Sequence, residues 1–184
     1  MIAMRKMLGM ILLACFLPAL PLKAHETGFP RETLKKVFPD ALGFSARKKT
    51  LTAEQLKSVE EKSGSKVQHN DNPLSYYLAL AKTPDGSGVL GSVLMIDARG
   101  PKGGIDLAVG ILRDGTVHRV VVVENKDEAG LASAEFLNQI QGKSLTSPLK
   151  VGEDIRYAGD AMSAKALLNA VHRGLYLYAA AQGK

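Results

Sequence analysis

Residues 105–125 read IDLAVGILRDGTVHRVVVVEN, and this stretch decides the fold. Two runs rich in Ile, Leu and Val lie on either side of Arg113-Asp114-Gly115. β-Branched residues favour extended chain, and an Asp-Gly pair between two such runs is a strong signal for a tight turn. The stretch therefore predicts a β-hairpin that turns at Asp114-Gly115.

The residues before it repeat the pattern. LSYYLALAKT (74–83) and VLGSVLMIDA (89–98) are both strand-like, and the short PDGSG segment separates them. This arrangement places another turn at Asp85-Gly86. The sequence therefore predicts two antiparallel hairpins in succession.

Helical patterns frame the hairpins. Apolar residues recur at helical spacing in four stretches, and Thr52 followed by Gln55 has the spacing of a capping box. The predicted helices span residues 30–38, 52–62, 131–141 and 162–181, and the polar residues 63–73 predict a loop. Two hairpins framed by helices predict an α+β fold with an antiparallel sheet.

The first 24 residues predict a secretory signal peptide. Arg5 and Lys6 precede an apolar run from Met7 to Leu20, which is too short to span a bilayer comfortably. Its removal after Ala24 lowers the formal charge from +6 to +3, a mild excess that argues against nucleic-acid binding. The predicted organisation is residues 1–24 as signal peptide, 25–73 as an N-terminal helical segment and loop, and 74–184 as the main domain.

Cys15 is the only cysteine, and it lies inside this leader. The mature chain then has no disulfide, redox thiol or cysteine metal site. Leu12-Leu13-Ala14-Cys15 also resembles a lipobox, which would anchor the protein through a lipid on Cys15. Because the apolar run continues past Cys15 to Leu20, the sequence favours a cleaved, periplasmic protein.

Several chemistries are absent from the pattern. The four histidines (His25, His69, His118 and His172) do not have a short metal-ligand spacing. The sequence has no Ser-His-Asp pattern or nucleophile elbow. These observations leave no catalytic residue and no metal ligand to predict, and they disfavour a hydrolase.

The second half of the chain carries a resemblance. AVGILRDGTVHRVVVVENKDEAGLASAEFLNQIQGKSL (108–145) and GEDIRYAGDAMSAKALLNAVHRGL (152–175) resemble the FMN-binding domain. That domain occurs in the flavin-carrying subunits of the sodium-pumping quinone reductase and of the Rnf complex, and in small exported relatives. In the family, an E-T-P-G-L-G loop follows the hairpin and a D-A-x-S-G-A-T-x-[ST]-S loop opens the last helix. Residues 127–132 and 159–163 fill these two loops, so the resemblance implies that residues 74–184 form an FMN-binding-like domain.

The resemblance implies a set of FMN-binding residues. Gly130 and Leu131 would approach the flavin ring, with Glu128 orienting their loop. A glycine turn before a helix offers N–H groups and the positive helix end to a phosphate, with Lys165 and Arg156 as nearby cations. The implied set is Glu128, Gly130, Leu131, Gly159, Asp160, Ala161, Met162, Ser163 and Lys165.

The sequence departs from the family at the residue that anchors the cofactor. Ala161 stands where the flavin-acceptor Thr would be, and no Thr follows Thr146. FMN is therefore expected to bind non-covalently or to have been lost. Asp160 adds a carboxylate beside the expected phosphate, which costs energy unless a cation intervenes. Its structural interpretation is an N-cap of the last helix.

Each of the other residues also has an ordinary structural interpretation. Glu128 can be an exposed loop acid, Leu131 a core residue, and Lys165 and Arg173 solvated charges. Two functions stay open. In the first, the chain is an exported FMN-binding domain that passes electrons to a membrane or periplasmic redox partner, rather than a stand-alone enzyme. Alternatively, it is a degenerate member without flavin that serves as a binding or assembly module of a redox or transport system.

Overall fold

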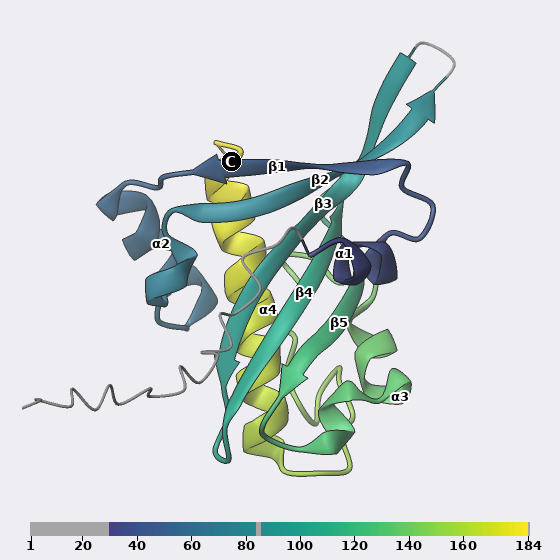
Figure 1. The fold of residues 1–184 in the computed structure, drawn as a ribbon. Helices are drawn as coiled ribbons and strands as arrows, with labels where there is room; N and C mark the ends of the chain where they lie inside the picture. Colours follow the sequence, from purple (N-terminus) through teal and green to yellow (C-terminus); the bar gives the residue numbers. More distant parts are fainter. Residues whose placement is uncertain (1–29, 84–85, 184) are drawn as a thin grey trace, which may run out of the picture.

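The computed structural model describes residues 30–83 and 86–183. Within these ranges, five antiparallel strands form one sheet in the order of the chain (Figure 1). The strands are β1 (Gly43–Lys49), β2 (Leu74–Thr83), β3 (Gly86–Arg99), β4 (Gly104–Leu112) and β5 (Val117–Asn125). The α+β prediction with an antiparallel sheet is confirmed.

Both predicted hairpins are present. In the second, Gly115 has φ 90°, which a side chain would disfavour, and Asp114 accepts the N–H of Thr116 at 2.9 Å. In the first, β2 and β3 pair as far as Thr83 and Gly86. The tip at residues 84–85 lies outside the described residues, as do the predicted leader, Cys15 and His25.

The helices cover the two faces of the sheet unequally. The long α4 (Ala161–Ala181) and α2 (Ala53–Ser63) lie on one face, and the short α1 (Arg31–Val37) lies on the other (Figure 1). Successive residues of β3 point to opposite faces of the sheet. Leu94 and Ile96 belong to the core on the α4 face, and Val93 belongs to the core on the α1 face. Within the described ranges, no helix combines the length and apolar character needed to cross a membrane.

Strand β1 was not predicted from the sequence. Its residues GFSARKK show no apolar alternation, because β1 is an edge strand whose last four residues are exposed. Pairing with β2 from Gly43↔Leu80 to Lys49↔Leu74 holds it in place. The segment expected as helix and loop, residues 25–73, therefore supplies one strand of the same sheet.

The single helix predicted over residues 131–141 is wrong. The segment forms a 3-10 turn (Ala129–Ala132), the one-turn α3 (Ala134–Leu137) and a second 3-10 turn (Asn138–Ile140). Ser133 begins α3 by accepting the N–H of Phe136 at 3.3 Å. The breaks bring Leu131, Phe136 and Ile140 into the core together, and one straight helix would spread these positions around its circumference. Tertiary packing therefore overrides the helical spacing here.

The capping box of α2 supports a first testable prediction. Thr52 Oγ1 accepts the N–H of Gln55 at 3.3 Å, and Gln55 Oε1 accepts the N–H of Thr52 at 2.9 Å. Thr52→Ala removes the side-chain acceptor and is expected to lower the free energy of unfolding by about 1 kcal/mol. Urea denaturation followed by circular dichroism measures this loss. Thr50→Ala, an exposed threonine outside the helix, is the matched control and should change little.

Candidate functional site

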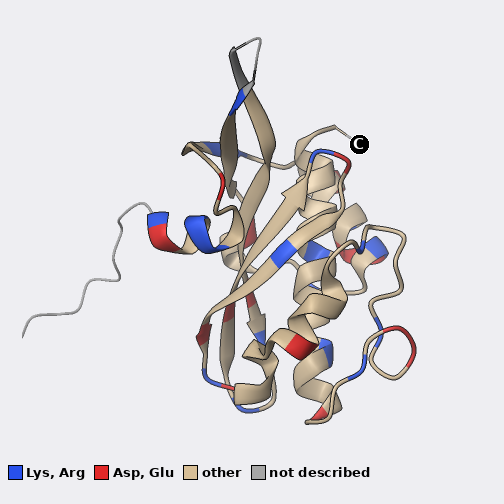
Figure 2. Cartoon of the chain, turned by 90° about the vertical axis from the view of Figure 1, so that its right-hand side faces the viewer, with Lys and Arg blue, Asp and Glu red and all other residues tan. Residues whose placement is uncertain are grey.

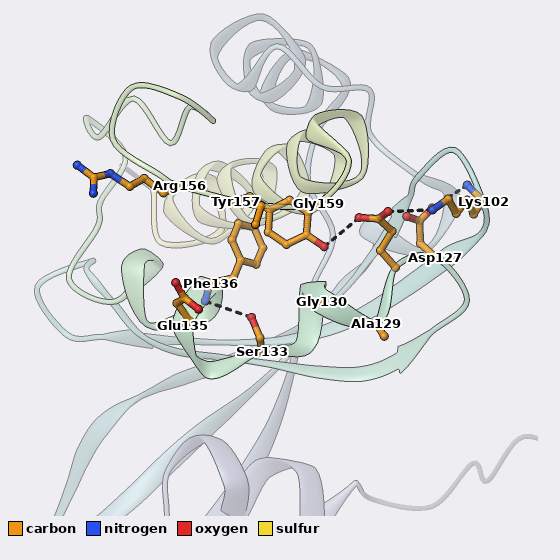
Figure 3. A pocket seen from close by; sticks show the side chains of 12 residues that line it. Lys102, Asp127, Ala129, Gly130, Ser133, Glu135, Phe136, Arg156, Tyr157 and Gly159 are labelled. Atoms are coloured by element: carbon orange, nitrogen blue, oxygen red, sulfur yellow. Dashed lines mark hydrogen bonds and ion pairs between the residues drawn. The ribbon is translucent and has the colours of Figure 1, made fainter.

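One cavity brings together the two loops singled out from the sequence. It has a volume of about 560 Å³ and lies between residues 127–136, which follow β5, and residues 156–159, which precede α4. We call it the Tyr157 cavity. Figure 3 shows Tyr157 lying against Phe136, with its hydroxyl directed at a carboxylate. Its lining includes Lys102, Glu128, Gly130, Phe136, Arg156 and Gly159.

Glu128 is the centre of the hydrogen bonding in this cavity. Its Oε2 accepts the Tyr157 hydroxyl at 3.0 Å and the Asp160 N–H at 2.9 Å, and its Oε1 pairs with Lys102 Nζ at 2.8 Å. The Lys102 ammonium and the Asp160 N–H hold the pKa of the Glu128 carboxyl below its usual range. The Glu128 side chain is only 19% exposed, so it is not the exposed loop acid of the structural interpretation.

Tyr157 fills the space beside both glycines. A Cβ at Gly130 would lie 2.8 Å from the Tyr157 hydroxyl oxygen, and a Cβ at Gly159 would lie 2.5 Å from Glu128 Oε2. Burial and the Glu128 carboxylate raise the pKa of Tyr157 to about 12, so its hydroxyl keeps its proton and donates. Each glycine is therefore needed for close approach to this chain's own side chains.

The start of α4 carries its own anions. Asp160 Oδ1 accepts the N–H of Met162 at 3.0 Å, and Asp160 Oδ2 accepts the Ser163 hydroxyl at 3.0 Å. The predicted N-cap role of Asp160 is confirmed. A third carboxylate, Asp127, lies nearby and accepts the N–H of Lys102 at 2.7 Å. Burial of Asp127 opposes its charge. The neighbouring Ser163 and the N–H groups of Lys102 and Gly103 outweigh burial and hold the pKa of Asp127 below its usual range.

An FMN phosphate does not fit at this helix start. The N–H of Asp160 is bonded to Glu128, and that of Met162 is bonded to Asp160, so carboxylates from the chain already use these donors. Within the described ranges, Lys102 is the one lysine or arginine that pairs with Glu128. A dianionic phosphate would meet net repulsion here.

The nine residues implied by the resemblance do not all line one cavity. Glu128, Gly130 and Gly159 line the Tyr157 cavity. Leu131 is fully buried in the core, and Asp160 and Ser163 form the cap of α4. Ala161, Met162 and Lys165 line a different cavity, on the far side of the helix start.

The sequence indicated neither Lys102 nor Phe136 as a site residue. Phe136 and Tyr157 together form what we call the aromatic wall of the cavity. Lys102 comes from the connection between β3 and β4 and reaches Glu128 only because the fold brings that turn to the end of β5. Phe136 was read as one apolar position of a helix. Only the pairing of β4 with β5, from Ile105↔Asn125 inward, places these segments together.

Charge is mixed over the rest of the molecule. Figure 2 shows lysine and arginine positions interspersed with acidic ones along loops and helices. This distribution agrees with the mild charge excess of the sequence.

Comparisons with known proteins give a remote structural likeness. No family model matches the sequence, and no curated protein matches it. The crystal structure of NqrC from Shewanella oneidensis is 15% identical over 80% of this chain and 74% of that chain, with a TM-score of 0.48. A likeness of this degree does not assign a cofactor or an activity to the chain.

Proposed function

We propose that this chain is an exported binding module whose fold is of the FMN-binding-domain type and whose helix start does not hold FMN. One observation carries the proposal. The Glu128 carboxylate bonds to the N–H of Asp160 at 2.9 Å, where a phosphate would need a donor. In addition, position 161, where the family has its flavin-acceptor Thr, is an alanine and has no hydroxyl. The predicted leader, residues 1–24, supports export, and the family resemblance supports a partner in a membrane or periplasmic redox or transport system.

A second function is favoured by the aromatic wall of the Tyr157 cavity. Phe136 and Tyr157 have ring centroids 4.7 Å apart and bound a volume of about 560 Å³, within the range of small-molecule sites. A flavin ring held non-covalently there would make the chain an electron-transfer protein. Its phosphate would then have to lie away from α4, on the side of Arg156, which also lines the cavity.

Flavin titration separates the two functions. The mature protein, starting after Ala24, is titrated with FMN and with riboflavin while flavin fluorescence is followed. We expect FMN to bind more weakly than about 100 μM. Micromolar or tighter FMN binding would contradict the proposal. Riboflavin binding tighter than that of FMN would favour the second function, with the ring accepted and the phosphate excluded.

A further inference from the structure

A second cavity lies beside the start of α4, and the proposed function does not use it. It has a volume of about 580 Å³ and is bounded by the end of α2, residues 148–153 and the first turns of α4. We call it the lysine groove. Its apolar lining is aliphatic, consisting of Pro148, Leu149, Val151, Ala161, Met162 and Leu168, and the imidazole of His172 is the one ring of the aromatic type among the described residues that line it. Such a lining fits a flexible alkyl chain better than a planar ring.

The charges around the groove are unbalanced. Its two glutamates each pair with a lysine: Glu61 with Lys57 at 3.8 Å and Glu153 with Lys150 at 3.5 Å. Lys62 and Lys165 also line the groove and have no ion-pair partner among residues 30–83 and 86–183. Two unpaired ammonium groups at the rim of an aliphatic groove complement an anionic group on an apolar chain.

The apolar rim is open to solvent. Met162 is 60% exposed, so its side chain is accessible to a ligand in the groove. Methionine is flexible and polarizable, and it adapts to ligands of varied shape.

The opposite wall is fixed before any ligand arrives. Leu149 has φ 46°, a left-handed conformation that is strained for leucine. The loop is held by Asp154, which accepts the N–H of Lys150 at 2.7 Å and pairs with Lys143 at 2.9 Å. These contacts give the groove a preformed wall.

We propose that the lysine groove binds an anionic amphiphile with a single alkyl chain. The anionic group lies between Lys62 and Lys165, and the chain lies on Leu149, Val151 and Leu168, with Met162 closing over it. The inference is independent of the Tyr157 cavity and goes beyond the proposed function, because no residue lines both cavities.

Calorimetric titration of the mature protein with monomeric dodecanoate tests the groove. We expect one site of micromolar affinity. The double charge reversal Lys62→Glu/Lys165→Glu is expected to weaken it by about tenfold. Lys48→Glu, an exposed lysine on β1 outside both cavities, is the matched control and should leave the affinity unchanged. Circular dichroism and thermal unfolding establish that each variant is folded. Met162→Asp is a second variant at an exposed position, and it should also weaken binding.

The head-group charge and the source of the ligand need separate probes. Dodecyltrimethylammonium has the same chain with a cationic head and should bind far more weakly than dodecanoate. Equal affinity for dodecanoate and dodecyltrimethylammonium, binding of neither dodecanoate nor lysophosphatidylglycerol, or an unchanged affinity in the double reversal would overturn the inference. Lysophosphatidylglycerol distinguishes a lipid head group from a free carboxylate, and one-to-one binding of either supports the groove. Binding to phosphatidylglycerol vesicles without binding of a single-chain probe would point to a membrane surface and would refute it.

Discussion

Arg173→Met is expected to lower the free energy of unfolding by about 3–5 kcal/mol, because it leaves the Asp71 carboxylate buried without its partner. Both side chains are 3% exposed, and Arg173 Nε lies 2.8 Å from Asp71 Oδ2. The guanidinium also donates to the carbonyl of Asp97 at 2.6 Å and to the Ser65 hydroxyl at 3.3 Å. Arg173 thus joins α4 to β3 and to the segment between α2 and β2.

The double variant Asp71→Asn/Arg173→Met distinguishes a buried charge from a general packing defect. The introduced amide retains an acceptor for the N–H of Gln68, which Asp71 Oδ2 accepts at 2.6 Å. Since no uncompensated charge is left, the double variant should be less destabilised than Arg173→Met alone. Urea denaturation followed by circular dichroism measures both. Arg99→Met removes an exposed arginine of β3 and serves as the control, with an expected change within about 0.5 kcal/mol.

The pH dependence of these variants has a definite sign. Burial raises the pKa of Asp71, against the opposing effects of the Gln68 N–H and of Arg173. A raised pKa in the folded state means that stability from this group is present at acid pH and is lost as pH rises through that pKa. Arg173→Met should therefore be less destabilised at acidic than at neutral pH. The double variant has no carboxyl at position 71 and should lack this difference. Equal destabilisation at both pH values would show that lost packing, not charge, dominates.

This ion pair also shows what the sequence could not reveal. Asp71 was part of a polar loop, and Arg173 was interpreted as a solvated charge on a helix. Asp71 does lie in the connection between α2 and β2. The solvated-charge interpretation of Arg173 is wrong, because tertiary structure buries both side chains and pairs them across a long sequence separation. The hairpins were predictable since their turn chemistry and apolar runs are local. Strand β1 was not, because its polar sequence becomes a strand only by pairing with β2.

In the candidate site too, some features could be predicted from the sequence and others could not. Glycines at 130 and 159 could be found because close backbone approach restricts a position to glycine. What approaches them could not be found, since the side-chain positions of Tyr157 and Glu128 depend on the assembled fold. The Asp160 cap followed from local sequence and is confirmed. Lys102 could not be linked to Glu128 because the two lie on different connections of the sheet.

The charge-neutralising variant Glu128→Gln/Asp160→Asn is expected to raise FMN affinity by at least about tenfold, because it removes two carboxylates from the helix start. The hydrogen-bond geometry at the start of α4 should persist in this variant. The glutamine introduced for Glu128 still presents an oxygen to the backbone N–H of position 160 and to Tyr157, and Asn is as good an N-cap as Asp. Riboflavin is the matched ligand, since it lacks the phosphate, and its affinity should not change. Flavin fluorescence quenching measures both ligands.

Adding Ala161→Thr to that background tests the register of the last loop. With a flavin transferase present, the triple variant is expected to acquire acid-stable flavin fluorescence. Ala161→Thr alone is not expected to acquire this fluorescence, because Glu128 and Asp160 still accept the N–H groups that a phosphate needs. Labelling of the single variant would show that these carboxylates do not exclude FMN. An increase in FMN affinity without labelling of the triple variant would show that position 161 is not the acceptor. If FMN and riboflavin respond alike to the neutralised pair, the phosphate is not the group that Glu128 and Asp160 exclude.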